Sequence, residues 1–375
     1  MNKNLSLYIH LPWCIKKCPY CDFNSHAVIG DIPEEAYIDC LLEDFNSHLT
    51  SIEGRQISSV FFGGGTPSLF SAESLNRLLK TLQSSIAFSS DCEITLEANP
   101  GTVEQTRFRK YFEIGINRIS LGIQSFQADK LKALGRIHND IEAHTAIDSV
   151  KKAGFINFNI DLMHGLPNQT SEESLNDIAQ AINHKPTHLS WYQLTIEPNT
   201  YFYKHTPTLP NENTLESIEM EGLGLLEKNN YQRYEISAYS LPGKQSQHNK
   251  NYWLFGDYLG IGAGAHSKLT VNSKITRHWN HKSPHSYMKK NELFISNKIE
   301  IKEPDIIFEF MLNALRLFEP VSFELFEQKT GLNRNVLKIP FELAVKKGLL
   351  KNKSFIETTD LGKKFLNDLC RIFIQ

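Results

Sequence analysis

The feature that most constrains the fold of this chain is a regular alternation of short apolar runs with amphipathic stretches. Thr170 and Glu173 form a capping box before one such stretch, and Ser71 with Glu73 opens another. Strand-like runs, each separated from the next by a helical stretch, lie at Leu5–His10, Ile57–Phe62, Glu93–Glu97, Arg118–Gly122, Asn157–Asp161 and His188–Leu194. This β-α order predicts an α/β fold, a partial (β/α)6 TIM-like barrel with a parallel sheet and outer helices.

Chemically distinctive residues follow the predicted strands, where a barrel of this kind builds its active site. They are Cys14 after the first strand, Gly63-Gly64-Gly65-Thr66-Pro67 after the second, Glu97 at the third, Gln124 at the fourth, Asp161 with His164 and Gly165 at the fifth, and Tyr192–Glu197 at the sixth. Each has a structural explanation of its own, such as a tight turn for the glycines or a helix cap for Glu97. Their combination nevertheless predicts a site, in which exposed N–H groups of the glycines can bind the amine or carboxylate of a small ligand.

Three cysteines, Cys14, Cys18 and Cys21, form a C-x-x-x-C-x-x-C pattern directly after the first predicted strand. Thiolates are the usual ligands of a four-iron cluster, and three of them leave one iron open to a substrate or cofactor. The alternative is structural zinc, which needs four ligands and for which His26 could be the fourth. The pattern favours the cluster, because no second Cys or His pair follows at finger spacing.

The composition indicates the cellular compartment in which the chain works and the partners it lacks a charge for. The chain has six cysteines in 375 residues, and the other three are scattered singly, which is typical of a reducing compartment. The sequence contains neither a secretory signal nor a long apolar run, so we expect a cytoplasmic protein without a membrane anchor, although transient membrane contact stays open. A net charge of −2 gives no electrostatic reason to expect nucleic acid as a partner.

The cysteine loop and five further motifs resemble the radical S-adenosylmethionine enzymes, in particular the branch of oxygen-independent coproporphyrinogen III oxidase. The motifs are Tyr8-Ile9-His10, Gly63–Pro67, Glu97–Pro100, Gly122–Ser125 and Gly135-Arg136. The resemblance implies a [4Fe-4S] cluster on Cys14, Cys18 and Cys21, with S-adenosylmethionine on its fourth iron. It also implies cofactor contacts from Tyr8, Tyr20, Gly64, Gly65, Thr66, Glu97, Gln124, Arg136 and Asp161.

Two departures separate this chain from the oxidase pattern. Phe23 stands where the oxidase has a further cysteine, and only thirteen residues precede Cys14. Both features are similar to the haem chaperone branch, as is the run His248-Asn249-Lys250-Asn251-Tyr252-Trp253, an H-N-x-x-Y-W signature. The resemblance implies that haem is the cargo, that His248 binds it, and that haem-requiring proteins, including respiratory ones, receive it. From the residues alone, Tyr252 and Trp253 could instead begin a buried strand with His248 exposed, and the oxidase remains the alternative function.

The character of the chain changes near residue 302, where three predicted helices, a hairpin at Leu349–Thr358 and a last helix at Leu361–Leu369 follow one another. This order predicts a small C-terminal winged-helix-like domain. We therefore expect a radical S-adenosylmethionine barrel over residues 1–235, a completing region over 236–300 and the winged-helix-like domain over 301–375. Because no basic stripe stands out, a lid or docking role is a better prediction than DNA binding by a regulator.

Overall fold

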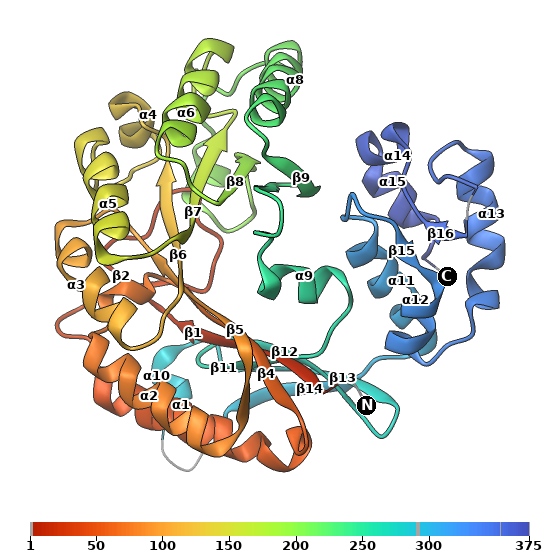
Figure 1. Ribbon diagram of the computed structural model, residues 1–375, viewed down its shortest axis with the longest axis horizontal. Coiled ribbons are helices and arrows are strands. Elements are labelled where there is room, and N and C mark those ends of the chain that lie inside the picture. Colours follow the sequence, from red (N-terminus) through yellow and green to blue (C-terminus); the bar gives the residue numbers. More distant parts are fainter. Residues whose placement is uncertain (1–2, 290–292, 353, 375) are drawn as a thin grey trace.

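A single curved sheet of twelve strands organises the computed structural model, which describes residues 3–289, 293–352 and 354–374 (Figure 1). Its centre is a run of six parallel strands in chain order, and these strands confirm all six predicted ones. They are β1 (Asn4–Leu11), β4 (Gln56–Gly64), β5 (Ala87–Ala98), β6 (Arg118–Gln124), β7 (Asn157–His164) and β8 (His188–Gln193). The predicted parallel α/β sheet is therefore present, as a curved and open one.

Further strands that were not predicted from the sequence extend both edges of the parallel run. β11 (Tyr258–Ile261) pairs with β1 in parallel, and β12 (His266–Val271), β13 (Lys274–Asn280) and β14 (Ile295–Glu300) continue the sheet in antiparallel fashion. At the opposite edge, β10 (Ala238–Ser240) and β9 (Gln232–Glu235) follow β8. The region predicted to complete the barrel thus contributes strands to the same sheet.

Helices cover the outer side of the sheet, as Figure 1 shows, and they bury the apolar faces that the sequence pattern predicted. Leu75, Leu78, Leu79 and Leu82 of α2 are at most 1% exposed and belong to the main core. The helices are α1 (Glu34–His48), α2 (Ala72–Ser85), α3 (Thr102–Glu113), α4 (Ala128–Ala133), α5 (Asp140–Ala153), α6 (Ser171–Asn183), α7 (Tyr201–Lys204), α8 (Glu212–Lys228), α9 (Gln247–Trp253) and α10 (Pro284–Tyr287), with short 3-10 turns at Leu49–Ile52 and Pro67–Leu69. None of the helices within the described ranges combines the length and apolar character needed to cross a bilayer.

The capping box at Thr170 is present: the Thr170 side chain accepts from the Glu173 N–H, and the Glu173 carboxylate accepts from the Thr170 N–H. We expect Thr170→Ala to lower the free energy of unfolding by about 1 kcal/mol, because it leaves an N–H at the start of α6 without its partner. Urea unfolding followed by circular dichroism measures the change. Glu172→Gln, an exposed change two positions away, should stay within about 0.5 kcal/mol of the wild type, and an equal loss in both variants would contradict the assignment.

The C-terminal segment forms a second core with elements in winged-helix order. Helices α11 (Glu303–Ala314), α12 (Phe323–Thr330) and α13 (Lys338–Lys346), the last preceded by a 3-10 turn at Arg334–Leu337, agree with the three predicted helices. Strand β15 (Val321–Ser322) pairs with β16 (Phe355–Ile356). Phe255 and Ile275 also belong to this core, so it draws on residues well before position 301.

One prediction for the C-terminal segment is confirmed and one needs correction. The small hairpin at Leu349–Thr358 is present as an antiparallel bridge between Leu350 and Thr358, and its second arm also pairs with β15 through Ile356 and Val321. The single last helix is two, α14 (Asp360–Lys364) and α15 (Leu366–Arg371), because Phe365 between them leaves helical geometry at φ −110° and ψ 42°.

Candidate functional site

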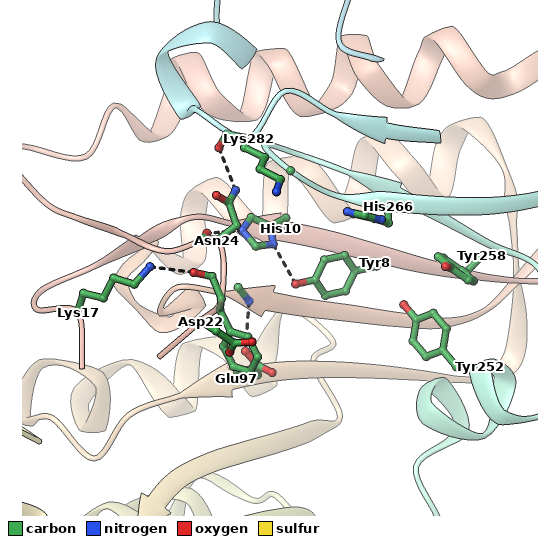
Figure 2. A pocket seen from close by; sticks show the side chains of 13 residues that line it. Tyr8, His10, Lys17, Asp22, Asn24, Glu97, Tyr252, Tyr258, His266 and Lys282 are labelled. Atoms are coloured by element: carbon green, nitrogen blue, oxygen red, sulfur yellow. Dashed lines mark hydrogen bonds between the residues drawn. The ribbon is translucent and has the colours of Figure 1, made fainter. Parts of the chain in front are cut away.

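Two adjoining cavities lie on the concave side of the sheet, next to α9. The outer cavity, of about 580 Å³, is lined by Tyr8, His10, Lys17, Asp22, Phe23, Asn24, Gly64, Glu97, Tyr252, Tyr258, Gly264, His266 and Lys282 (Figure 2). The inner cavity, of about 250 Å³, is lined by Tyr8, Phe61, Glu97, Arg118, Ser120, Asn159, Asp161, Ser190, His248, Asn249 and Tyr252. Tyr8, Glu97 and Tyr252 line both, so the two cavities meet at these side chains.

The cysteine loop stands beside the outer cavity and is held at its base by backbone pairing. Cys14 ends β2 (Trp13–Cys14), which pairs with β3 (His26–Ala27), and a bond from the Cys21 N–H to the Cys18 carbonyl closes a turn at 3.1 Å. Burial raises the pKa of the Cys14 thiol, and the neighbouring Cys21 and Cys18 raise it further. The three thiols are therefore close enough for each charge to affect the others.

The loop suits an iron-sulfur cluster better than a single zinc ion. Within the described ranges, no three Cys, His, Asp or Glu side chains converge on a point that one metal ion could occupy. The ligands of a four-iron cluster need not converge on one point, because each thiolate binds a different iron. His26, the predicted fourth zinc ligand, instead has a ring nitrogen 3.3 Å from the Asn24 side-chain oxygen. The donor set therefore fits the predicted cluster.

Backbone hydrogen bonds join the glycine loop at the end of β4 to the segment that leads into the cysteine loop. The Gly65 N–H donates to the Leu11 carbonyl at 2.8 Å, and the Thr66 N–H donates to the Trp13 carbonyl at 2.7 Å. A Cβ on Gly65 would lie only 2.4 Å from the Trp13 carbonyl oxygen, so this position tolerates no side chain without backbone movement. The two predicted binding loops thus form one unit.

Arg136 connects the cysteine loop to the ends of the next two strands. Its guanidinium donates to the Asn99 side chain at 2.7 Å and to the Gly122 carbonyl at 2.8 Å, and it lies 3.7 Å from the Cys18 sulfur. The Asn99 amide in turn donates to the Thr66 hydroxyl at 2.9 Å. Gln124, in a left-handed conformation at φ 64°, keeps a buried side-chain oxygen without a protein partner, as a ligand-binding acceptor would.

Two half-buried carboxyl groups, Glu97 and Asp161, face the inner cavity. Burial raises the pKa of Glu97 to about 8, and the negative charge of Asp161 adds to the shift. Burial also raises the pKa of Asp161, although Ser120 and Asn159 donate to its oxygens at 2.9 and 2.8 Å. Within the described residues, the Glu97 carboxyl accepts one hydrogen bond, from the Gly64 N–H at 3.3 Å, so this group is available to a cationic ligand.

The raised pKa of Glu97 predicts a pH-dependent stability. The folded protein binds the Glu97 proton more tightly than the unfolded chain, whose pKa is near 4.5, so stability falls as pH rises from 4.5 towards 8. We expect Glu97→Gln to match the wild type near pH 5 and to be more stable than it near pH 8.5, by urea unfolding without cofactor. Glu53→Gln, an exposed control, should follow the wild type at both pH values. A stability difference that does not grow with pH would contradict the assignment.

His248 lies in helix α9 and is buried, with only 1% of its surface exposed. Its Nδ1 lies 3.0 Å from the Ser59 hydroxyl and its Nε2 lies 3.1 Å from the Tyr252 hydroxyl. Burial and the charge of Arg118 lower its pKa to about 3. The sequence-based alternative, an exposed His248 before a buried strand, is therefore wrong.

The helix forms here because Glu93 of β5 caps its first turn. One carboxylate oxygen of Glu93 accepts from the backbone N–H groups of Gln247 and His248 at 3.0 and 3.4 Å. The same side chain lies 3.9 Å from the buried Arg118. Glu93, in the middle of β5, thus fixes the start of α9, the helix that places His248 and Tyr252 at the inner cavity.

Several cavity residues were missed by sequence reasoning. They are Arg118 and Ser120 of β6 and Asn159 of β7, which lies two positions before the predicted Asp161; all four line the inner cavity together. This period-two polar pattern within otherwise apolar strands was the available signal. His266 and Lys282 of the outer cavity had no comparable signal, because they lie in a part of the chain where no strand was predicted.

Comparison with known proteins places these features in context. The pattern of the Radical SAM superfamily matches residues 8–181, and that of the HemN C-terminal domain matches residues 301–361. The chain is 51% identical to "Heme chaperone HemW" of Haemophilus influenzae over 99% of this chain and 98% of the relative, and 46% identical to the protein of that name from Escherichia coli over the same shares. Among solved structures, coproporphyrinogen III oxidase (HemN) from Escherichia coli superimposes with a TM-score of 0.84 at 22% identity, over 100% of this chain and 91% of the oxidase. Likeness at this low identity concerns the fold alone.

Proposed function

Because this chain belongs to the HemW family of radical SAM proteins, we propose that it is a haem chaperone, which binds haem and delivers it to haem-requiring proteins. One observation carries the proposal: the outer cavity joins the cysteine and glycine loops on one side to the H-N-x-x-Y-W segment on the other. A cofactor held by the loops and a cargo held near α9 would thus share one space. We further propose that the protein works in the cytoplasm and that its recipients include respiratory haem proteins.

The cofactor side of the proposal assigns roles to the predicted residues. Cys14, Cys18 and Cys21 would hold the [4Fe-4S] cluster. Gly64, Gly65 and Thr66 would hold the amino acid end of S-adenosylmethionine, with Glu97 on its polar groups and Tyr8, Tyr20, Gln124, Arg136 and Asp161 as further contacts. When both are bound, they supply one-electron chemistry, which belongs to the cofactor rather than the protein. The chain's own part is to orient them and keep them away from water.

The cargo side separates the chaperone from the oxidase. Phe23, which replaces the further cysteine of the oxidase pattern, is 64% exposed and lines the outer cavity. Tyr252, Tyr258 and Phe23 offer aromatic surface to a porphyrin face. The H-N-x-x-Y-W resemblance implies that His248 binds haem, but its ring would have to leave the contacts with Ser59 and Tyr252 to reach an iron.

Anaerobic cluster reconstitution followed by a haem titration tests the proposal, with absorbance recorded with and without S-adenosylmethionine. We expect stoichiometric haem binding and no conversion of coproporphyrinogen III in a parallel incubation. Formation of protoporphyrinogen IX would favour the oxidase, and failure to bind haem would exclude the chaperone. Undetectable binding to duplex DNA at low salt, where phosphate contacts are strongest, would exclude a DNA-binding regulator.

A further inference from the structure

An exposed imidazole faces the outer cavity on the wall opposite the cysteine loop. His266, the first residue of β12, lines this cavity and is exposed, and its ring stacks on Trp279 of β13 at a centroid distance of 5.8 Å and an angle of 19°. Within the described residues, no hydrogen bond or ion pair to its ring nitrogens is found. Figure 2 shows the ring beside Lys282 and above Tyr8, with a nitrogen towards the cavity.

We infer that His266, rather than the buried His248, is the residue that ligates haem iron in the outer cavity, with the Lys282 ammonium placed to pair with a propionate; this inference rests on the proposed function. Imidazole is the common protein ligand of haem iron, and it binds in its neutral form. Burial, Arg277 and Lys282 lower the pKa of His266, which favours the neutral ring at physiological pH.

The two histidines differ in whether their ring nitrogens already have hydrogen-bond partners. Both nitrogens of His248 are within hydrogen-bond distance of hydroxyl groups, and its side chain faces the inner cavity of about 250 Å³. His266 faces the larger cavity, of about 580 Å³, and needs no rearrangement to bind a metal. His248 would then be a positioning residue, because its contact with the Tyr252 hydroxyl holds that ring on the wall that both cavities share.

The charges around the outer cavity suit a dianionic cargo on the His266 side. Lys282 is exposed, and no carboxylate of the described residues forms an ion pair with it. Lys17 lies across the cavity with its amine on the Phe23 and Ser25 carbonyls, at 3.0 and 3.3 Å. The acidic groups on the lining are Asp22 and Glu97, and Glu97 lies on the side of the glycine loop.

Titration of ferric haem into the purified protein tests the inference, with the absorbance and electron paramagnetic resonance signatures of imidazole ligation as the readout. We expect His266→Ala to lose these signatures and to weaken haem binding by about tenfold or more, a loss that even outer-shell changes reach at metal sites. Added imidazole should restore the signatures in His266→Gly. His205→Ala is the matched control, because His205 is also exposed and stacks on a tyrosine ring, Tyr201, away from the cavity.

The remaining outcomes separate the inference from the proposed function. If the wild type binds no haem, the chaperone proposal itself fails. If the wild type binds haem and His266→Ala keeps the imidazole signatures, the inference is overturned, and their loss in His248→Ala would then identify the motif histidine as the ligand. Lys282→Ala should weaken binding by about two- to fivefold, the range of an exposed ion pair, and less at high salt; no change at low salt would overturn the propionate assignment.

Discussion

Cys18→Ser is expected to abolish assembly of a complete iron-sulfur cluster, so that reconstituted protein contains far less iron than the roughly four atoms per chain of a full cluster. Cys18 and Cys21 lie on one tight turn, and the Cys18 sulfur faces the Arg136 guanidinium at 3.7 Å. Iron in such clusters binds thiolates, whereas a serine hydroxyl stays protonated and binds iron poorly. Iron and sulfide analysis, together with the broad visible absorbance of the cluster, measures the effect.

The control for this experiment is a cysteine of the same chain outside the loop. Cys370 is buried in the second core, far along the chain, so Cys370→Ser should leave the iron content unchanged even if it costs some stability. Cys18 is only half-buried, and we expect the cofactor-free variant to unfold within about 1 kcal/mol of the wild type. Full iron content in Cys18→Ser would show that the loop is not the cluster site.

The strands and the loops at their ends were predictable because the signals that place them are local. Each central strand is a short apolar run, and parallel strands must present their carboxyl ends on the same side. Glu97 and Asp161 were therefore predicted to share a site, and the structure places both on the inner cavity. The glycine and cysteine loops meet for the same reason.

The environment of His248 was not predictable, because residues distant in sequence create it. The carboxylate that caps its helix, Glu93, is 155 positions away, and Ser59 is 189 positions away. The hairpin of β12 and β13 was missed for a different reason: Lys268, Arg277 and His278 interrupt its apolar pattern, and Lys268 and Arg277 pair with Asp257 and Glu309. His266 belongs to that hairpin, so its position on the wall of the outer cavity was not predicted either.

Gly65→Ala is expected to impair both cofactor loops at once. Its Cβ would lie 2.4 Å from the Trp13 carbonyl oxygen and 2.7 Å from the Pro12 carbonyl, distances that real Cβ atoms do not adopt. Both neighbours are backbone atoms, so no side-chain rotation relieves the clash. The Pro12–Trp13 segment must therefore move away from the glycine loop, and Cys14 is the next residue along that segment.

The displacement predicts a specific combination of effects. The hydrogen bond from the Thr66 N–H to the Trp13 carbonyl, 2.7 Å long, would stretch or break, and the overpacking should cost about 1–3 kcal/mol of stability. We expect reconstitution to yield less iron and calorimetry to show weak or no binding of S-adenosylmethionine, with a folded circular dichroism spectrum retained.

Gly224→Ala is the matched control for this glycine. Gly224 lies in α8 with no atom within 4 Å of an added Cβ, so alanine should keep both cofactors and raise stability by up to about 1 kcal/mol, the difference in helix propensity. If Gly65→Ala binds iron and S-adenosylmethionine like the wild type, the positions of the two loops are independent, and the coupling inferred from their hydrogen bonds is contradicted. If it loses S-adenosylmethionine but keeps a full cluster, the displacement is confined to the glycine loop, and the contact with Trp13 does not govern the position of Cys14.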